Sequence, residues 1–104
     1  MELTQLEYFM TVARLEHMTM ASKALGITQP ALSHAIAKLE NEIGAPLFER
    51  NGRNVKLNRN GAMFSRWVGK ALQNIENGVK EIENGLIRIR GLLLYPISIF
   101  LALT

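Results

Sequence analysis

The sequence predicts a mainly α-helical protein that carries one β-hairpin, and three observations support this fold class. The first 44 residues contain stretches with helical periodicity, each bounded by start or stop signals. Two short alternating segments follow Pro46, with an Asn-Gly pair between them. The remainder carries an apolar residue every three or four positions from Val68 to Ile89. A small helical head followed by one long helix accounts for these patterns.

Composition limits both the size of the protein and its chemistry. A chain of 104 residues provides material for about one domain. Cysteine is absent, which excludes disulfides and thiolate zinc sites and fits a reducing cytosol, so we expect a cytoplasmic protein. The apolar segment 91–104 is shorter than the ~20 residues of a spanning helix and contains Pro96. We therefore expect no membrane span.

Groups that could carry catalysis or bind a metal are sparse. The only histidines, His17 and His34, have no metal-ligand spacing to each other or to a carboxylate cluster. The serines lack a nucleophile-elbow context, and no Gly-rich phosphate loop is present. We expect no enzyme, no catalytic residue, no metal site and no cofactor.

Two short helices are expected before the central one. Thr4 and Glu7 have the spacing of a capping box, which predicts the start of the first helix. Thr19 is a second start signal, for a helix over residues 20–25 that ends on Gly26. The expected core of the head is Leu6, Phe9, Leu25, Leu32, Ile36, Leu39 and Leu57. Four methionines are expected to fill gaps in that core: Met10, Met18, Met20 and Met63.

The central helix, residues 28–43, has two faces of different character. Thr28 is a suitable N-cap, and Gly44 supplies the stop. The apolar face is formed by Leu32, Ile36, Leu39 and Ile43. The other face is small and polar, which suits close approach to base edges and phosphates, and consists of Pro30, Ser33, His34, Ala37 and Asn41, flanked by Gln29 and Lys38. With the short helix and three-residue turn before it, this is a helix-turn-helix pattern, although hairpins in ordinary helical bundles have a similar one.

The hairpin segments, residues 47–50 and 55–57, begin a strongly basic stretch. Between Arg50 and Lys70 the chain contains no Asp or Glu, and its basic residues are Arg50, Arg53, Lys56, Arg59, Arg66 and Lys70. Such a block is typical of a surface that faces a polyanion, with a solvated basic loop as the alternative. A hairpin with a basic tip beside a groove-entering helix is a wing, and Arg50, Arg53 and Lys56 would reach phosphates or the minor groove.

The long helix is expected to start after Asn58, an N-cap, and to pack its first turns on the head through Phe64 and Trp67. Its apolar seam follows heptad spacing and predicts dimerisation through Val68, Leu72, Ile75, Val79, Ile82 and Leu86. The alternative is that the seam packs back on its own domain. Four glycines, each costing ~1 kcal/mol relative to Ala, leave the free helix marginal. The expected division is therefore a head over 1–58, a dimerising helix over 59–90 and an apolar tail over 91–104.

Several motifs, taken in order, resemble the N-terminal DNA-binding domain and linker helix of LysR-type transcriptional regulators. The resemblance covers roughly residues 3–86 and rests on L-x-x-F at 6–9, A-S-K-A-L at 21–25, T-Q-P-A-L-S at 28–33, L-E-N-E-I-G at 39–44, P-L-F-E-R at 46–50, and V-x-L followed by Gly61. It implies a winged helix-turn-helix, a three-helix head with a two-stranded β wing, that dimerises through linker helices and binds a partly palindromic promoter site in double-stranded DNA. It also implies that Gln29, Pro30 and Ser33 meet the major groove and that Arg53 reaches the minor groove.

This sequence departs from the family pattern in two places. His34 stands where the family usually has Arg or another long polar residue, which shortens the reach of that side chain. The chain also ends at Thr104, where such regulators continue into an effector-binding domain, so we expect no small-molecule effector response. The expected DNA-binding residues are Thr28, Gln29, Pro30, Ser33, His34, Lys38, Arg50, Arg53 and Lys56. The alternative is a protein-interaction module, or an antagonist of full-length relatives, that acts through the coiled-coil helix.

Overall fold

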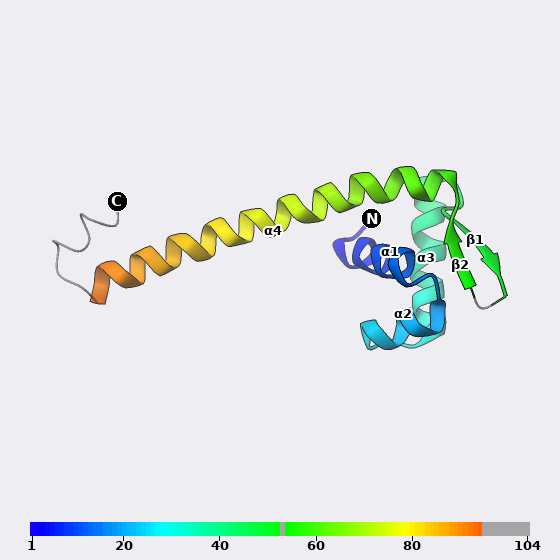
Figure 1. The fold of residues 1–104 in the computed structure, drawn as a ribbon, viewed down its shortest axis with the longest axis horizontal. Helices are drawn as coiled ribbons and strands as arrows, with labels where there is room; N and C mark the ends of the chain where they lie inside the picture. The colour runs from blue at the N-terminus through cyan, green and yellow to red at the C-terminus, as the bar shows by residue number, and fades with distance from the viewer. Residues whose placement is uncertain (53, 95–104) are drawn as a thin grey trace. The chain divides into compact units, whose positions relative to one another are not determined.

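The structure, a computed structural model, describes residues 1–52 and 54–94, with side chains described as far as residue 86. Its elements are α1 (Leu3–Leu15), α2 (Met18–Leu25), α3 (Gln29–Ile43), β1 (Phe48–Asn51), β2 (Asn54–Leu57) and α4 (Arg59–Leu94), as Figure 1 shows. One compact unit comprises Met1–Lys70, and a second begins at Ala71. The predicted fold class, a three-helix head with a two-stranded wing and a long helix after it, is confirmed. Arg53 and the tail beyond residue 94 lie outside the described residues.

The core of the first unit is built around Phe9 of α1, which is fully buried. Its ring lies 5.4 Å from the ring of Phe48 in β1 and 5.3 Å from the ring of Phe64 in α4, in tilted geometry. Three elements that are distant in sequence therefore meet on one aromatic side chain. The largest fully buried side chains are Phe9, Leu32, Ile36, Leu39, Leu47 and Val12. Of the predicted core, Leu6, Leu25 and Leu57 are only half-buried.

The first turns of α4 pack on the head through a different residue pair from the one predicted. Phe64 contacts Phe9, as expected, but Trp67 is 64% exposed and Val68 is only 3% exposed. The prediction for Trp67 was wrong because neighbouring helical positions point ~100° apart, and the face that carries Phe64 continues to Val68. The Lys70 ammonium instead lies over the Trp67 ring, 4.9 Å from its centroid.

The direction in which each helical face points also determines which of the four methionines are buried. Met18 is buried and Met10 is half-buried, so both contribute to the core as predicted. Met20 and Met63 are exposed, and the prediction that they fill the core was wrong. Ile43, the last member of the predicted apolar face of α3, is also partly exposed, at 36%.

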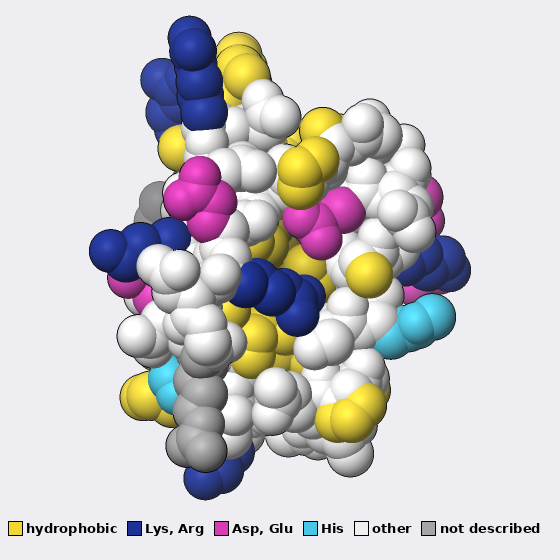
Figure 2. All heavy atoms as spheres, turned by 90° about the vertical axis from the view of Figure 1, so that its right-hand side faces the viewer, with side chains coloured by type: hydrophobic (Ala, Val, Ile, Leu, Met, Phe, Trp, Pro, Cys, Tyr) yellow, Lys and Arg dark blue, Asp and Glu magenta, His cyan; other side chains and the backbone are white. Residues whose placement is uncertain are grey.

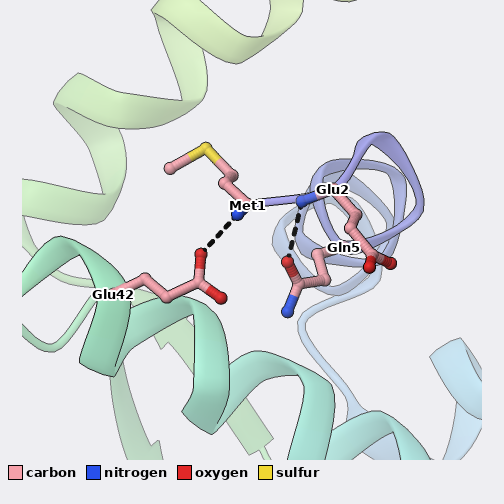
Figure 3. A network of polar contacts seen from close by, with 4 residues as sticks. All are labelled: Met1, Glu2, Gln5 and Glu42. Carbon is pink, nitrogen blue, oxygen red and sulfur yellow. Dashed lines mark hydrogen bonds and ion pairs between the residues drawn. The ribbon is translucent and has the colours of Figure 1, made fainter.

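The first helix starts earlier than its sequence signal indicated. The Glu2 N–H donates to Gln5 Oε1 at 2.9 Å, so Glu2 is the N-cap and Thr4 lies inside α1, which corrects the predicted Thr4 start. Beside this cap, the α-amino group of Met1 forms an ion pair with Glu42 near the end of α3, at 2.7 Å (Figure 3). The hydrogen bond from this amino group lowers the pKa of Glu42 below its ordinary value, partly opposed by desolvation.

Two side chains fasten the connection between α3, the hairpin and α4. Glu40 Oε2 accepts from the Leu47 N–H at 2.6 Å, which holds the entrance to β1 against the last turns of α3. Asn58 Oδ1 accepts from the Gly61 N–H, and Asn58 Nδ2 donates to the Pro46 carbonyl, both at 2.8 Å. Asn58 is thus the predicted N-cap of α4 and also joins it to the start of the hairpin.

Candidate nucleic-acid interface

The helix-turn-helix is held by local caps at both ends of its turn. Gly26 ends α2 in the left-handed conformation, at φ +70°, and the Ile27 N–H donates to the Ser22 carbonyl at 3.0 Å. Thr28 then accepts from the Ala31 N–H at 3.2 Å, which confirms it as the N-cap of α3. Pro30 falls in the first turn, where its missing N–H costs nothing, and Gly44 ends the helix at φ +88°.

The outer face of α3 is open to solvent along its N-terminal half. The exposed residues include Thr28, Gln29, Pro30, His34, Ala37 and Lys38, whereas Ser33 is half-buried. The first turn contains no acidic residue. Helix N-termini carry partial positive charge, so this end of α3 attracts phosphate groups and repels none of them through a carboxylate.

Helix α2 begins at Met18, and its N-cap is His17, which corrects the predicted start at Thr19. The Met20 N–H donates to His17 Nδ1 at 3.1 Å. Thr19 instead donates its hydroxyl to Gln29 Oε1 at 3.1 Å. The sequence reading therefore missed Thr19 as a neighbour of a site residue. The signal was present, because a helix-turn-helix brings the start of its first helix close to the start of its second.

The wing is an antiparallel pair in which Phe48 lies opposite Leu57 and Asn51 opposite Asn54. Gly52 in the connection has φ +61°, the sign that tight hairpin turns require. Directly paired residues share a face of the ladder, so Arg50 lies on the same face as buried Val55, while exposed Lys56 lies opposite Glu49 on the other face. Arg53 falls outside the described residues.

The wing is joined to the helical head as well as to α4. The Val55 N–H donates to the Glu16 carbonyl at 3.0 Å, and His17 and Asn54 form an antiparallel bridge. Glu16 adopts a left-handed conformation, at φ +53°, where α1 ends. This turn places the start of α2 directly beside β2, so the wing and the helix-turn-helix form one surface.

Figure 2 views the side of the molecule on which the hairpin stands in Figure 1, and Lys and Arg side chains project from it at several points. A hollow of about 310 Å³ lies where the start of α2, the start of α3 and the wing meet. It is lined by Met18, Thr19, Gln29, Arg50, Gly52 and Val55. The structure thus brings predicted site residues from α3 and from the wing, Gln29 and Arg50, to one hollow.

Among the described residues, the basic side chains of this surface form no ion pair within the chain. The ion pairs found among the described side chains join Met1 to Glu42 and Lys80 to Glu76, and neither includes a predicted DNA-binding residue. The described part of the chain contains no group of His, Asp and Glu residues that could hold a metal ion. In the same residues, no helix is both long and apolar enough to cross a membrane.

The apolar seam of α4 begins inside the head and continues beyond it. Val68 is buried in the first unit, whereas Leu72 is half-buried. Four later members, Ile75, Val79, Ile82 and Leu86, are 47%, 48%, 66% and 49% exposed. A Cβ atom added at Gly78 or Gly85 would meet nothing within 4 Å apart from the neighbouring backbone of α4, so there is open space beside the helix at both positions.

Comparison with known proteins places this architecture in a family. Residues 3–62 match the bacterial regulatory helix-turn-helix protein family of the lysR type. The HTH-type transcriptional regulator BudR of Klebsiella aerogenes is 55% identical over 88 residues, which cover 85% of this chain and 61% of BudR. The uncharacterized HTH-type transcriptional regulator YybE of Bacillus subtilis (strain 168) is 52% identical over 83 residues, 80% of this chain. The chain spans only 28% of the length of YybE.

Solved structures show the same similarity. The crystal structure of the BenM_DBD/benA site 1 DNA complex has a TM-score of 0.77 and 38% identity, covering 81% of this chain and 98% of that one. The CbnR_DBD–DNA complex also has a TM-score of 0.77, at 29% identity, and covers 83% of this chain and 99% of that one. The family match covers more than half of the chain, and the protein belongs to the LysR family of bacterial regulatory helix-turn-helix proteins.

Proposed function

We propose that the protein binds double-stranded DNA with sequence preference and acts as a transcription regulator of the LysR type. The observation that carries this proposal is the exposed N-terminal half of α3, which stands beside a wing bearing Arg50 and Lys56. An α-helix fits the major groove, where base edges are read, and basic side chains on a flanking wing reach the phosphates. The structural similarity to two domains solved with DNA supports it.

Within this proposal the residues divide into two classes. From α3, base edges would be faced by Gln29, Ser33 and His34. Pro30, which follows Gln29, would lie within contact range of the DNA. Thr28, Lys38, Arg50 and Lys56 would contact phosphates, and Arg53, whose position is not described, would reach the minor groove. The first class sets which sequence is preferred, and the second sets affinity for any sequence. A DNA-binding regulator of a bacterial family works where the DNA is, so we infer a cytoplasmic location.

We infer further that two copies pair through α4. The exposed side chains of Ile75, Val79, Ile82 and Leu86 form a stripe that the second unit does not cover in the described residues. Ala71, Gly78 and Gly85 follow the same seven-residue spacing along one edge of this stripe. Residues without a large side chain allow the backbones of two α4 helices to approach closely. This accounts for glycines at positions where they weaken the isolated helix. Val68 contributes to head packing, so the free part of the seam starts after it.

The second candidate function, a protein-interaction module that acts through α4, has support from the same exposed stripe. A module of that kind has no use for a basic wing beside an open helix face. Selection of bound sites from random duplex DNA, at two salt concentrations, separates the two functions. We expect one enriched site and an affinity that falls ~10³–10⁵-fold between 50 and 200 mM salt for 6–10 phosphate contacts. If no site is enriched, or if binding ignores salt, the DNA-binding function is wrong and the interaction module remains.

A further inference from the structure

The hydrogen bond from Thr19 to Gln29 links the two helices of the helix-turn-helix at the surface proposed to face DNA. The backbone that carries its donor is held by two further hydrogen bonds. Ser22 Oγ, in a buried side chain, donates to the Thr19 carbonyl at 2.8 Å, and His17 caps the same turn through the Met20 N–H. From this backbone the Thr19 hydroxyl donates to the first residue of α3.

This bond decides which end of the Gln29 amide remains available. A glutamine amide has one acceptor oxygen and one NH₂ group with two donor hydrogens. Since Gln29 Oε1 is directed to Thr19, Nε2 is the atom left to face a ligand. Glutamine reads adenine through both atoms at once, accepting from N6 and donating to N7. Thr19 occupies one lone pair of the oxygen and turns the NH₂ group outward, so the amide presents mainly donors, and the natural partner of such a donor is the N7 acceptor of a purine.

The surroundings of Gln29 favour an acceptor as well. The hollow that Thr19 and Gln29 line receives Arg50 from the hairpin, and no carboxylate belongs to its described lining. Arg50 has N–H donors and no acceptor. The polar side-chain groups that the hollow can offer to a ligand are thus mainly donors, with the Gln29 oxygen already partnered by Thr19.

We propose that Thr19 is a positioning residue for sequence preference, because its hydroxyl orients the Gln29 amide so that position 29 reads purine N7. The proposal rests on the proposed DNA-binding function and adds to it a residue that need not touch a base. Removal of the hydroxyl frees the amide to rotate, so position 29 loses its preference for the acceptor while the rest of the interface is unchanged.

The matched variants Thr19→Val and Thr19→Ser test this idea, because the first removes only the hydroxyl function at similar size and the second retains it. Each is titrated with the selected site and with the same site carrying 7-deazapurines, in which C–H replaces N7 and base pairing is preserved. Wild type and Thr19→Ser should lose about two- to tenfold in affinity at one 7-deaza position, the effect of about one hydrogen bond. Thr19→Val and Gln29→Ala should lose that sensitivity, and the double variant should show no additional effect. Thermal unfolding establishes that each variant is folded.

The possible failures are distinguishable. If the wild-type protein enriches no site, both the proposed function and this proposal are wrong. If Thr19→Val keeps the full 7-deaza sensitivity, or if its effect adds to that of Gln29→Ala, only the positioning role is overturned. An equal loss of affinity for all sequences in Thr19→Val, with sensitivity retained, would show instead that the hydroxyl contacts a phosphate.

Discussion

Gly61 in the first turn of α4 lies directly against the main-chain carbonyl of Leu47 at the entrance to the wing. A Cβ atom at position 61 would overlap the Leu47 carbonyl oxygen and come within 2.8 Å of Leu57 Cδ2. The Gly61 N–H is at the same time bound by Asn58 Oδ1, so the helix cannot move away without losing its cap. Glycine at this position lets the wing and the first turns of α4 pack together in the first compact unit.

We expect Gly61→Ala to destabilise the head. Alanine is favoured over glycine in a helix by ~1 kcal/mol, but overpacking against a backbone atom costs about 1–3 kcal/mol, and the steric term should win. The matched control is Gly69→Ala, at a helical position where an added Cβ atom would make only an ordinary contact with Met10 Cε at 3.6 Å, and it should stabilise α4 by about 0.5–1 kcal/mol. Denaturant unfolding of both variants measures the difference. Equal effects at the two positions would mean that the Leu47 contact is unimportant.

The ion pair between the Met1 amino group and Glu42 gives a prediction for acid stability. The pKa of Glu42 is lowered in the folded protein, first by the hydrogen bond from the amino group. A carboxyl with a depressed folded-state pKa contributes stability that is present above its ordinary pKa, near 4.5, and is lost as the pH falls through the lower folded value. Glu42→Gln should therefore flatten the pH dependence of unfolding in this acid range.

The measurement is thermal unfolding of wild type and Glu42→Gln between pH 7 and about pH 3. The control is Glu83→Gln, at an exposed position of α4, which should leave the wild-type profile unchanged. NMR titration of the Glu42 carboxyl reports its pKa directly. A midpoint at or above the ordinary glutamate value would contradict the prediction.

The sequence predicted an element best where the deciding signal was local. Thr28 and Gly44 mark the two ends of α3 as expected, because an N-cap hydroxyl and a left-handed glycine act within one turn of their own backbone. The start of α2 was predicted at Thr19 because threonine is a common cap and histidine is not. His17 has that role because its backbone is extended, at φ −154°, by the bridge to Asn54 in the wing.

Predictions that depended on contacts between distant segments were less accurate. Whether Trp67 or Val68 faces the head depends on where Phe9 and Phe64 meet, and periodicity alone does not fix this phase to a single residue. No partner for Glu40 could be predicted from the sequence. In the structure its carboxylate accepts a hydrogen bond from the Leu47 N–H, which lies beyond the end of α3 and beyond Pro46. Side-chain bonds such as Thr19 to Gln29 likewise appear only once the two helices are placed.

Arg50 and Lys56 give a prediction about the salt dependence of DNA binding. Each is exposed on the wing, on opposite faces of the ladder. If each contacts one phosphate, Arg50→Ala or Lys56→Ala should weaken binding to all sequences about equally and make the slope of log affinity against log salt shallower by about one. Gln29→Ala and Ser33→Ala should instead change the selected sequence and leave that slope unchanged. Filter binding over a salt series, with selected and scrambled duplexes, separates the two classes.

The exposed seam of α4 predicts that tight DNA binding depends on residues that touch no DNA. Ile75→Asp together with Ile82→Asp places two carboxylates in the stripe, where pairing of two helices would bury them without partners, so the dimer should dissociate. The head should remain folded because its core around Phe9, Leu32 and Leu39 does not involve these positions. The resulting monomer should bind a single half-site weakly, since a two-fold site needs two heads held at a fixed spacing.

The matched control is Asn77→Asp together with Asn84→Asp, which adds the same charge at the same seven-residue spacing but on the face of α4 opposite the seam. That control should stay dimeric and protect the whole site, because carboxylates there remain in water when the seams pair. Sedimentation gives the mass of each variant, and footprinting gives the length of DNA protected. A seam variant that stays dimeric, or a monomer that protects the full site at wild-type concentration, would show that α4 does not couple pairing to DNA binding.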